Sequence, residues 1–134
     1  DQEIINKQNL SINELFSKSE VQFRELEYDE IKKYSSRNNI VLAVGGGAVT
    51  FKKSYDLMAS MCCIYLKTSM QVLTDRLEGD SSRPLLKENN KHQMLEKIFN
   101  ERKELYLSLS SCEIDTDRNS LSDNCDKIME FVNG

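Results

Sequence analysis

Three consecutive glycines, Gly45, Gly46 and Gly47, directly follow an apolar run at residues 40–44. The run is rich in β-branched residues, which predicts a buried strand. Ligands of an open α/β sheet bind beyond the carboxyl ends of its strands, and glycines there let a ligand approach the backbone closely. The simpler interpretation is a tight turn from strand to helix, but such a turn usually needs one glycine. We therefore expect these glycines to contact a ligand.

Arg102 falls on a helical stripe that is otherwise apolar, formed by Leu95, Ile98, Leu105 and Leu109. A guanidinium on such a face is costly unless it is paired, and its planar fork suits a carboxylate or a phosphate. The alternative is an arginine whose side chain extends past the edge of the core to solvent. This residue alone does not decide between the two.

Arg24 and Glu27 stand at positions i and i+3 of an expected helix, so they are neighbours on its surface. The carboxylate could hold the guanidinium in a fixed orientation for an anionic ligand. From the spacing alone, the favoured interpretation is an ordinary surface ion pair worth under about 1 kcal/mol.

Arg83 lies beside the only proline of the chain, in a polar loop at residues 79–92. A loop with one arginine could close over phosphates and exclude water, as lids do, although a solvated loop is the simpler interpretation. Asp1 suits either the N-cap of a helix over residues 2–7 or the end of a strand outside the chain. His92 has no nucleophile nearby in sequence and receives no role.

Strand and helix patterns alternate along the chain, which predicts an α/β fold in which a parallel sheet carries helices on both faces. A capping box at Ser11 and Glu14 indicates where one helix begins. The expected strands are 40–44, 62–66 and 112–115, and the other expected helices are 20–36, 69–79, 95–109 and 121–132. We interpret residues 1–134 as one domain. Three strands are few for such a sheet, so we expect the fold to be incomplete at its N-terminus.

Composition excludes several classes of protein. The net charge is −4 without a stripe of Lys and Arg, so no nucleic-acid partner is expected. No apolar run approaches the roughly 20 residues of a membrane span. The cysteines lack metal-ligand spacing, and we interpret them as core thiols of a cytoplasmic protein with no metal site of its own; they are Cys62, Cys63, Cys112 and Cys125.

The motifs together resemble the shikimate kinase family in order and spacing. The start of the chain is similar to the end of the family's D-x-D-x-E-I motif, and residues 11–27 resemble its SI-x-x-(I/L)F…E-x-x-FR-x-x-E signature. The resemblance continues through VLA-x-GGG at 41–47, IYL at 64–66, RPLL at 83–86, Arg102 with Tyr106, and Asp115 with Thr116. It covers essentially the whole chain. Asn9 and Ser19 depart from it, because the family usually has glycine at both positions.

The resemblance implies transfer of the γ-phosphate of ATP to the 3-hydroxyl of shikimate, with Mg²⁺ as a cofactor, by a cytoplasmic monomer. Asp1 would bind the hydroxyls of shikimate and orient or deprotonate the attacking one. Arg24 and Arg102 would hold the shikimate carboxylate, with Glu27 positioning Arg24. The remaining implied roles are ring packing for Gly45, Gly46 and Gly47, phosphoryl stabilisation for Arg83, and adenine contact for Arg76 and Asn119. Residues 9–39 would form the substrate-binding helices, and 79–92 the lid.

No G-x-x-x-x-G-K-[ST] sequence occurs in the 134 residues. The family begins with a strand, this P-loop, a helix and a second strand, and the P-loop segment would hold most of the ATP phosphates and Mg²⁺. We therefore expect a longer natural protein and no turnover by this chain alone. The alternatives are a related P-loop small-molecule kinase such as a gluconate kinase, and a non-catalytic shikimate-binding or regulatory module.

Overall fold

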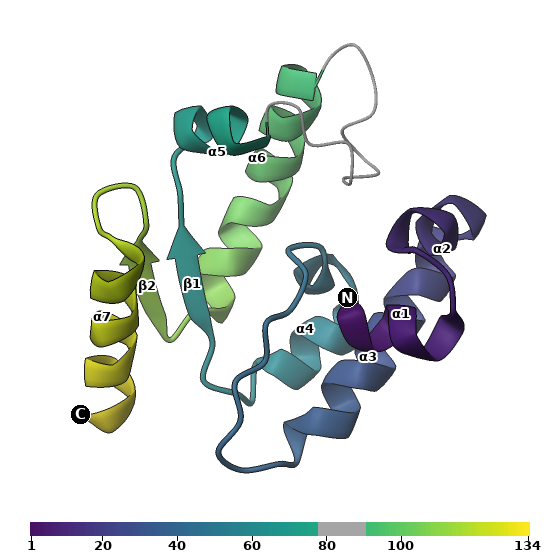
Figure 1. Cartoon of the computed structure of the whole chain (residues 1–134), viewed down its shortest axis with the longest axis horizontal. Coiled ribbons are helices and arrows are strands. Elements are labelled where there is room, and N and C mark those ends of the chain that lie inside the picture. The colour runs from purple at the N-terminus through teal and green to yellow at the C-terminus, as the bar shows by residue number, and fades with distance from the viewer. Residues whose placement is uncertain (78–90) are drawn as a thin grey trace. The chain divides into compact units, whose positions relative to one another are not determined.

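The computed structural model describes residues 1–77 and 91–134, which form two compact units that divide at Met61 and Cys62. The first unit is helical and contains α1 (Gln2–Gln8), α2 (Ile12–Lys18), α3 (Glu20–Ser35), the 3₁₀ turn η1 (Ala48–Thr50) and α4 (Lys52–Met58). The second unit contains β1 (Ile64–Lys67), α5 (Met70–Leu77), α6 (Lys91–Leu109), β2 (Cys112–Asp115) and α7 (Leu121–Asn133) (Figure 1).

Local signals set the ends of the first three helices. The predicted capping box at α2 is confirmed: Ser11 Oγ accepts from the Glu14 amide, and the Glu14 carboxylate accepts from the Ser11 amide at 2.8 Å. The Ser11 hydroxyl and the Ser11 amide both donate to the Glu14 carboxylate, which lowers the pKa of Glu14. Ser19 caps α3 by accepting from the Gln22 amide. Asn9 ends α1 with φ 52°, a left-handed conformation that asparagine tolerates.

A small apolar core joins α1, α2 and α3. Its buried members are Ile4, Leu15 and Phe23, one from each helix. Phe16 packs its ring 5.7 Å from that of Phe23. The helix α1 has only seven residues and is too short to be stable by itself in water. Its place in the unit therefore depends on contacts with α2 and α3.

Ser54 on α4 is fully buried, at 0% exposure, and its hydroxyl makes no hydrogen bond to any described residue. An unpaired buried hydroxyl carries an uncompensated desolvation penalty. We expect Ser54→Ala to raise the free energy of unfolding by about 1 kcal/mol in urea denaturation. The matched control is Ser60→Ala, because the exposed Ser60 hydroxyl bonds to the Leu57 carbonyl and its loss should have little effect. A lower stability for Ser54→Ala would contradict this account.

The second unit contains two parallel strands. Ile64 pairs with Cys112 and Lys67 with Asp115, and the chain passes through α5 and α6 between the strands. Such a crossover is typical of α/β folds. The predicted strand at 112–115 is confirmed, while the strand expected at 62–66 begins two residues later, at Ile64. The helix α7 lies along β2 (Figure 1).

The prediction of a strand at residues 40–44 is wrong, because the structure has no strand in this segment. No described residue pairs with this segment, and the sheet contains β1 and β2 alone. Val41 is 97% exposed, so the expected burial is wrong as well. β-branched composition favours an extended chain, but a strand also needs a hydrogen-bonded neighbour.

The burial predicted for the cysteines is also wrong in part. None of the four forms a disulfide; Cys62 and Cys125 are exposed, Cys63 and Cys112 are half-buried, and burial raises the pKa of Cys63. Cys125 shares the apolar stripe of α7 with Leu121 and Val132, which are 82% and 59% exposed. Periodicity identifies an apolar face, but it does not show what covers that face. Within residues 1–77 and 91–134, no helix has the length and apolar character needed to cross a membrane.

Candidate functional site

Arg24 and Glu27 form a buried ion pair on α3. Arg24 Nη1 donates to Glu27 Oε2 at 2.8 Å, and the two residues are only 6% and 5% exposed. The interpretation as an ordinary surface pair is therefore wrong. A buried pair is retained only where its geometry is good and its remaining polar atoms are used. Arg24 Nε is buried and makes no hydrogen bond to any residue in the described ranges.

The glycine segment packs directly against this ion pair. A Cβ at Gly47 would overlap the Arg24 guanidinium, with Nη2 closest and Cζ at 2.6 Å. A Cβ at Gly45 would lie 2.8 Å from Glu27 Oε1. Any side chain at these two positions would therefore displace the pair. The glycines predicted to contact a ligand thus also make room for the groups that would bind it.

Asp1 brings a second carboxylate to the same place. Asp1 Oδ1 lies 3.8 Å from the position that a Cβ on Gly45 would occupy. Glu27 Oε1 lies 2.8 Å from the same position. Asp1 is the N-cap of α1, yet its side chain makes no capping hydrogen bond. Aspartate at an N-cap usually accepts from a helix amide. The Asp1 carboxylate therefore does not cap its own helix, and it lies beside Gly45 and Glu27 instead.

Two aromatic rings and a second acid complete the surroundings of Arg24. The Arg24 guanidinium lies 5.3 Å from the centre of the Phe23 ring and 5.7 Å from that of Phe16. Glu20 Oε1 lies 3.5 Å from Arg24 Nη2. Cation–π contacts orient a guanidinium as well as stabilising it. We did not predict these contacts: the spacing of Glu20 and Arg24 on α3 is a signal for their pairing, but Phe16 lies on α2, before the extended Ser19, and no helical spacing relates it to Arg24.

A separate polar cluster lies at the carboxyl ends of β1 and β2 in the second unit. The hydroxyls of Thr68 and Thr116 share a hydrogen bond of 2.7 Å, and the Ser69 amide donates to Asp117 Oδ2 at 2.9 Å. Hydrogen bonding from the Ser69 hydroxyl and the Ser69 amide lowers the pKa of Asp117. Ligands of parallel sheets bind at this end of the strands. The loops there are thus joined into one polar surface.

Arg76 and Asn119, the residues predicted to contact adenine, both reach this surface. Arg76 Nη2 donates to the Thr116 carbonyl at 3.5 Å. Asn119 Nδ2 donates to the Asp115 carbonyl at 2.6 Å, and its Oδ1 accepts from Lys127 at 2.9 Å. Both ends of the Asn119 amide are engaged within the protein. The Asn119 side chain therefore stabilises the conformation of the loop. The backbone of the loop, and not this amide, would contact a ligand.

Arg102 lies half-buried on α6, on the face that also carries Ile98 and Leu105, as predicted. It forms no ion pair with any residue in the described ranges 1–77 and 91–134. Arg24 and Arg102 belong to different units. Arg83 and most of the predicted lid at 79–92 lie outside the described residues.

Comparisons with known proteins identify the family of the chain. The family described as shikimate kinase matches the chain over residues 1–133. The chain belongs to the shikimate kinase family. A shikimate kinase of Geobacter sulfurreducens is 35% identical over 131 residues, which cover 96% of this chain and 72% of that relative. One of Buchnera aphidicola is 34% identical over 90% of this chain and 71% of its own length.

Solved shikimate kinases share the fold. The shikimate kinase of Acinetobacter baumannii in complex with shikimate has a TM-score of 0.92 and 30% identity, over 98% of this chain and 75% of that one. The enzyme of Bacteroides thetaiotaomicron has a TM-score of 0.84 over 100% of this chain and 81% of that one; at 22% identity it supports the fold alone. The predicted α/β fold of the P-loop kinase type is thereby confirmed. Membership of this family supports an ATP-dependent kinase.

Proposed function

We propose that the protein transfers the γ-phosphate of ATP to the 3-hydroxyl of shikimate. One observation carries the proposal: a buried guanidinium and two carboxylates, from Arg24, Glu27 and Asp1, converge beside the Gly45 and Gly47 backbone. Shikimate is an anion at one end and hydroxylated at the other. The site thus offers a cation for the carboxylate and acceptors for the hydroxyls. The Acinetobacter baumannii relative, solved with shikimate, supports this assignment.

Arg24 binds the shikimate carboxylate in this proposal. Its guanidinium is held by Glu27 at 2.8 Å and by the two phenyl rings, so little side-chain freedom is lost when the ligand arrives. Its buried Nε makes no hydrogen bond to the part of the chain that the structure describes. Arg102 supplies the second cation, since its guanidinium sits on an apolar face without an ion pair among the described residues.

Asp1 and Glu27 bind the hydroxyls of the ring. Asp1 Oδ1, which makes no capping bond, orients the attacking hydroxyl and accepts its proton as the bond to phosphorus forms. The transition state of phosphoryl transfer is loose, so catalysis rests on positioning and charge stabilisation. Gly46 lies between the two glycines that pack on these side chains and presents its backbone to the ring.

ATP binds with its adenine at the loop over residues 115–119, beside Arg76. Arg83 stabilises the transferring phosphoryl group from the lid. Within residues 1–77 and 91–134, no cluster of carboxylate, histidine or cysteine side chains could hold a metal ion such as Mg²⁺. No P-loop sequence occurs in the chain. The proposal therefore gives no step to the metal or the P-loop. We also propose that the protein is cytoplasmic, which cell fractionation tests. We propose that it is a monomer, which size-exclusion chromatography tests.

The test is ADP release by protein made from the complete reading frame that contains this chain. We expect release that requires shikimate, with no stimulation by gluconate, and a large loss in Arg102→Ala. Stimulation by gluconate but not shikimate would favour the related small-molecule kinase. Tight shikimate binding with no ADP release would favour a non-catalytic module, and the enzyme assignment would then be withdrawn.

A further inference from the structure

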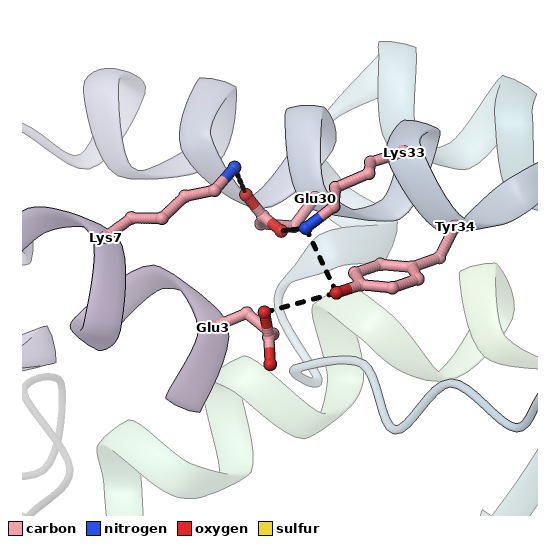
Figure 2. Close-up of polar contacts among 5 residues, drawn as sticks. All are labelled: Glu3, Lys7, Glu30, Lys33 and Tyr34. Carbon is pink, nitrogen blue, oxygen red and sulfur yellow. Dashed lines mark hydrogen bonds and ion pairs between the residues drawn. The ribbon is translucent and has the colours of Figure 1, made fainter.

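Five polar residues form a continuous chain of contacts between α1 and α3 (Figure 2). Lys7 of α1 pairs with Oε1 of Glu30, and Lys33 lies 3.7 Å from the other oxygen of Glu30. Lys33 Nζ donates to the Tyr34 hydroxyl at 3.1 Å, and that hydroxyl donates to Glu3 Oε2 at 3.2 Å. The chain thus leaves α1 at Lys7, runs along α3 and returns to α1 at Glu3. We call these five residues the α1–α3 network.

The α1–α3 network holds α1 at two points one turn apart. Lys7 and Glu3 stand at i and i+4, so their contacts limit both the distance of α1 from α3 and its rotation about its own axis. The only buried side chain of α1 is Ile4. Ile4 anchors α1 to the core at one point along the helix, and the network adds two polar contacts that restrict rotation of α1 about that point.

Glu30 is the centre of the network. The residue is 8% exposed, and a buried carboxylate requires cations nearby. Lys7 approaches one oxygen of Glu30 from α1, and Lys33 approaches the other from α3, the helix that carries Glu30 (Figure 2). Lys33 is exposed, and its hydrogen bond from Nζ to Tyr34 raises its pKa, so it stays charged at neutral pH. Removal of Lys7 leaves Glu30 with Lys33 alone and breaks one of the two ties to α1, so that only the Tyr34–Glu3 contact remains.

We propose that the α1–α3 network positions Asp1 for the reaction, with Lys7 and Glu30 as positioning residues. Asp1 directly precedes α1, so the orientation of α1 sets where its carboxylate lies beside Gly45 and Glu27. The Asp1 side chain makes no bond to α1 that would hold it otherwise. The inference rests on the proposed function, in which Asp1 binds a shikimate hydroxyl.

Steady-state kinetics of Lys7→Met in the complete protein tests this role. We expect the KM for shikimate to rise and kcat to fall, together lowering kcat/KM about tenfold, while the KM for ATP stays within about twofold. Lys7→Arg should restore the pair and most of the activity. Glu30→Gln, which keeps the shape of Glu30, should resemble Lys7→Met. The matched control is Lys52→Met, because Lys52 pairs with Asp56 in an exposed i, i+4 contact on α4.

A double-mutant cycle separates positioning from a general structural role. If Lys7 acts through Asp1, Lys7→Met should change the KM for shikimate by less than about twofold in an Asp1→Asn background. Equal effects in both backgrounds, or equal rises in both KM values, would overturn the proposal. Wild-type protein that shows no shikimate-dependent ADP release would overturn the proposed function instead, and normal kinetics in Lys7→Met would overturn the positioning role alone.

Discussion

Asp1→Asn is expected to lower kcat for shikimate phosphorylation by about 10²-fold or more, with a smaller change in the KM for ATP. Loss of a group that accepts a proton in the transition state typically has an effect of this size. The substitution keeps the size of the side chain and removes its negative charge. Because Asp1 makes no capping hydrogen bond, α1 loses no contact. The measurement is steady-state ADP release by the complete protein.

The control for Asp1→Asn is Asp56→Asn, since Asp56 is an exposed acid on α4 that pairs only with Lys52 among the described residues. We expect Asp56→Asn to retain wild-type kinetics and Asp1→Asn to retain the wild-type melting temperature. Full activity in Asp1→Asn would remove Asp1 from the mechanism and leave its carboxylate without a function.

Gly47→Ala is expected to lower kcat/KM for shikimate by about 10²-fold. The new methyl group would occupy the place of the Arg24 guanidinium, whose Cζ lies 2.6 Å from the Cβ position. Gly47 has φ −85°, which alanine adopts without strain, so the effect acts through Arg24 and not through the backbone. A displacement of about 1 Å in a binding group can reduce the rate to this extent.

Gly134→Ala is the matched control, because a Cβ there meets only the Glu130 carbonyl at 3.0 Å, at the end of α7. Calorimetric titration with shikimate should show weaker binding for Gly47→Ala and unchanged binding for Gly134→Ala. Unchanged shikimate affinity in a folded Gly47→Ala protein would contradict the packing of the glycine segment on Arg24.

Features with a local cause were predictable from the sequence. The capping box at Ser11 depends on residues within one turn, and it is present as expected. The strand at 112–115 and the helix that begins at Glu20 also follow from short-range patterns. The sequence motifs also identified the family correctly, because their joint order is far more specific than any one of them.

Features that depend on distant partners were not predictable. Spacing on α3 could not reveal that Arg24 and Glu27 are buried, because the backbone that covers them comes from Gly45 and Gly47, a distant segment. The segment 40–44 has the composition of a strand but lacks a pairing neighbour among the described residues. The α1–α3 network joins residues 23 and 31 positions apart, which no helical periodicity relates.

The most direct test of the binding site compares shikimate with its methyl ester by calorimetric titration of the complete protein and of Arg24→Lys. Lysine keeps a positive charge beside Glu27 but loses the planar fork of arginine. We predict that the wild type binds shikimate at least about tenfold more tightly than the ester, and that Arg24→Lys loses most of this preference. A wild type that binds both ligands equally, or an Arg24→Lys variant with the full preference, would contradict the assignment of Arg24 to the shikimate carboxylate.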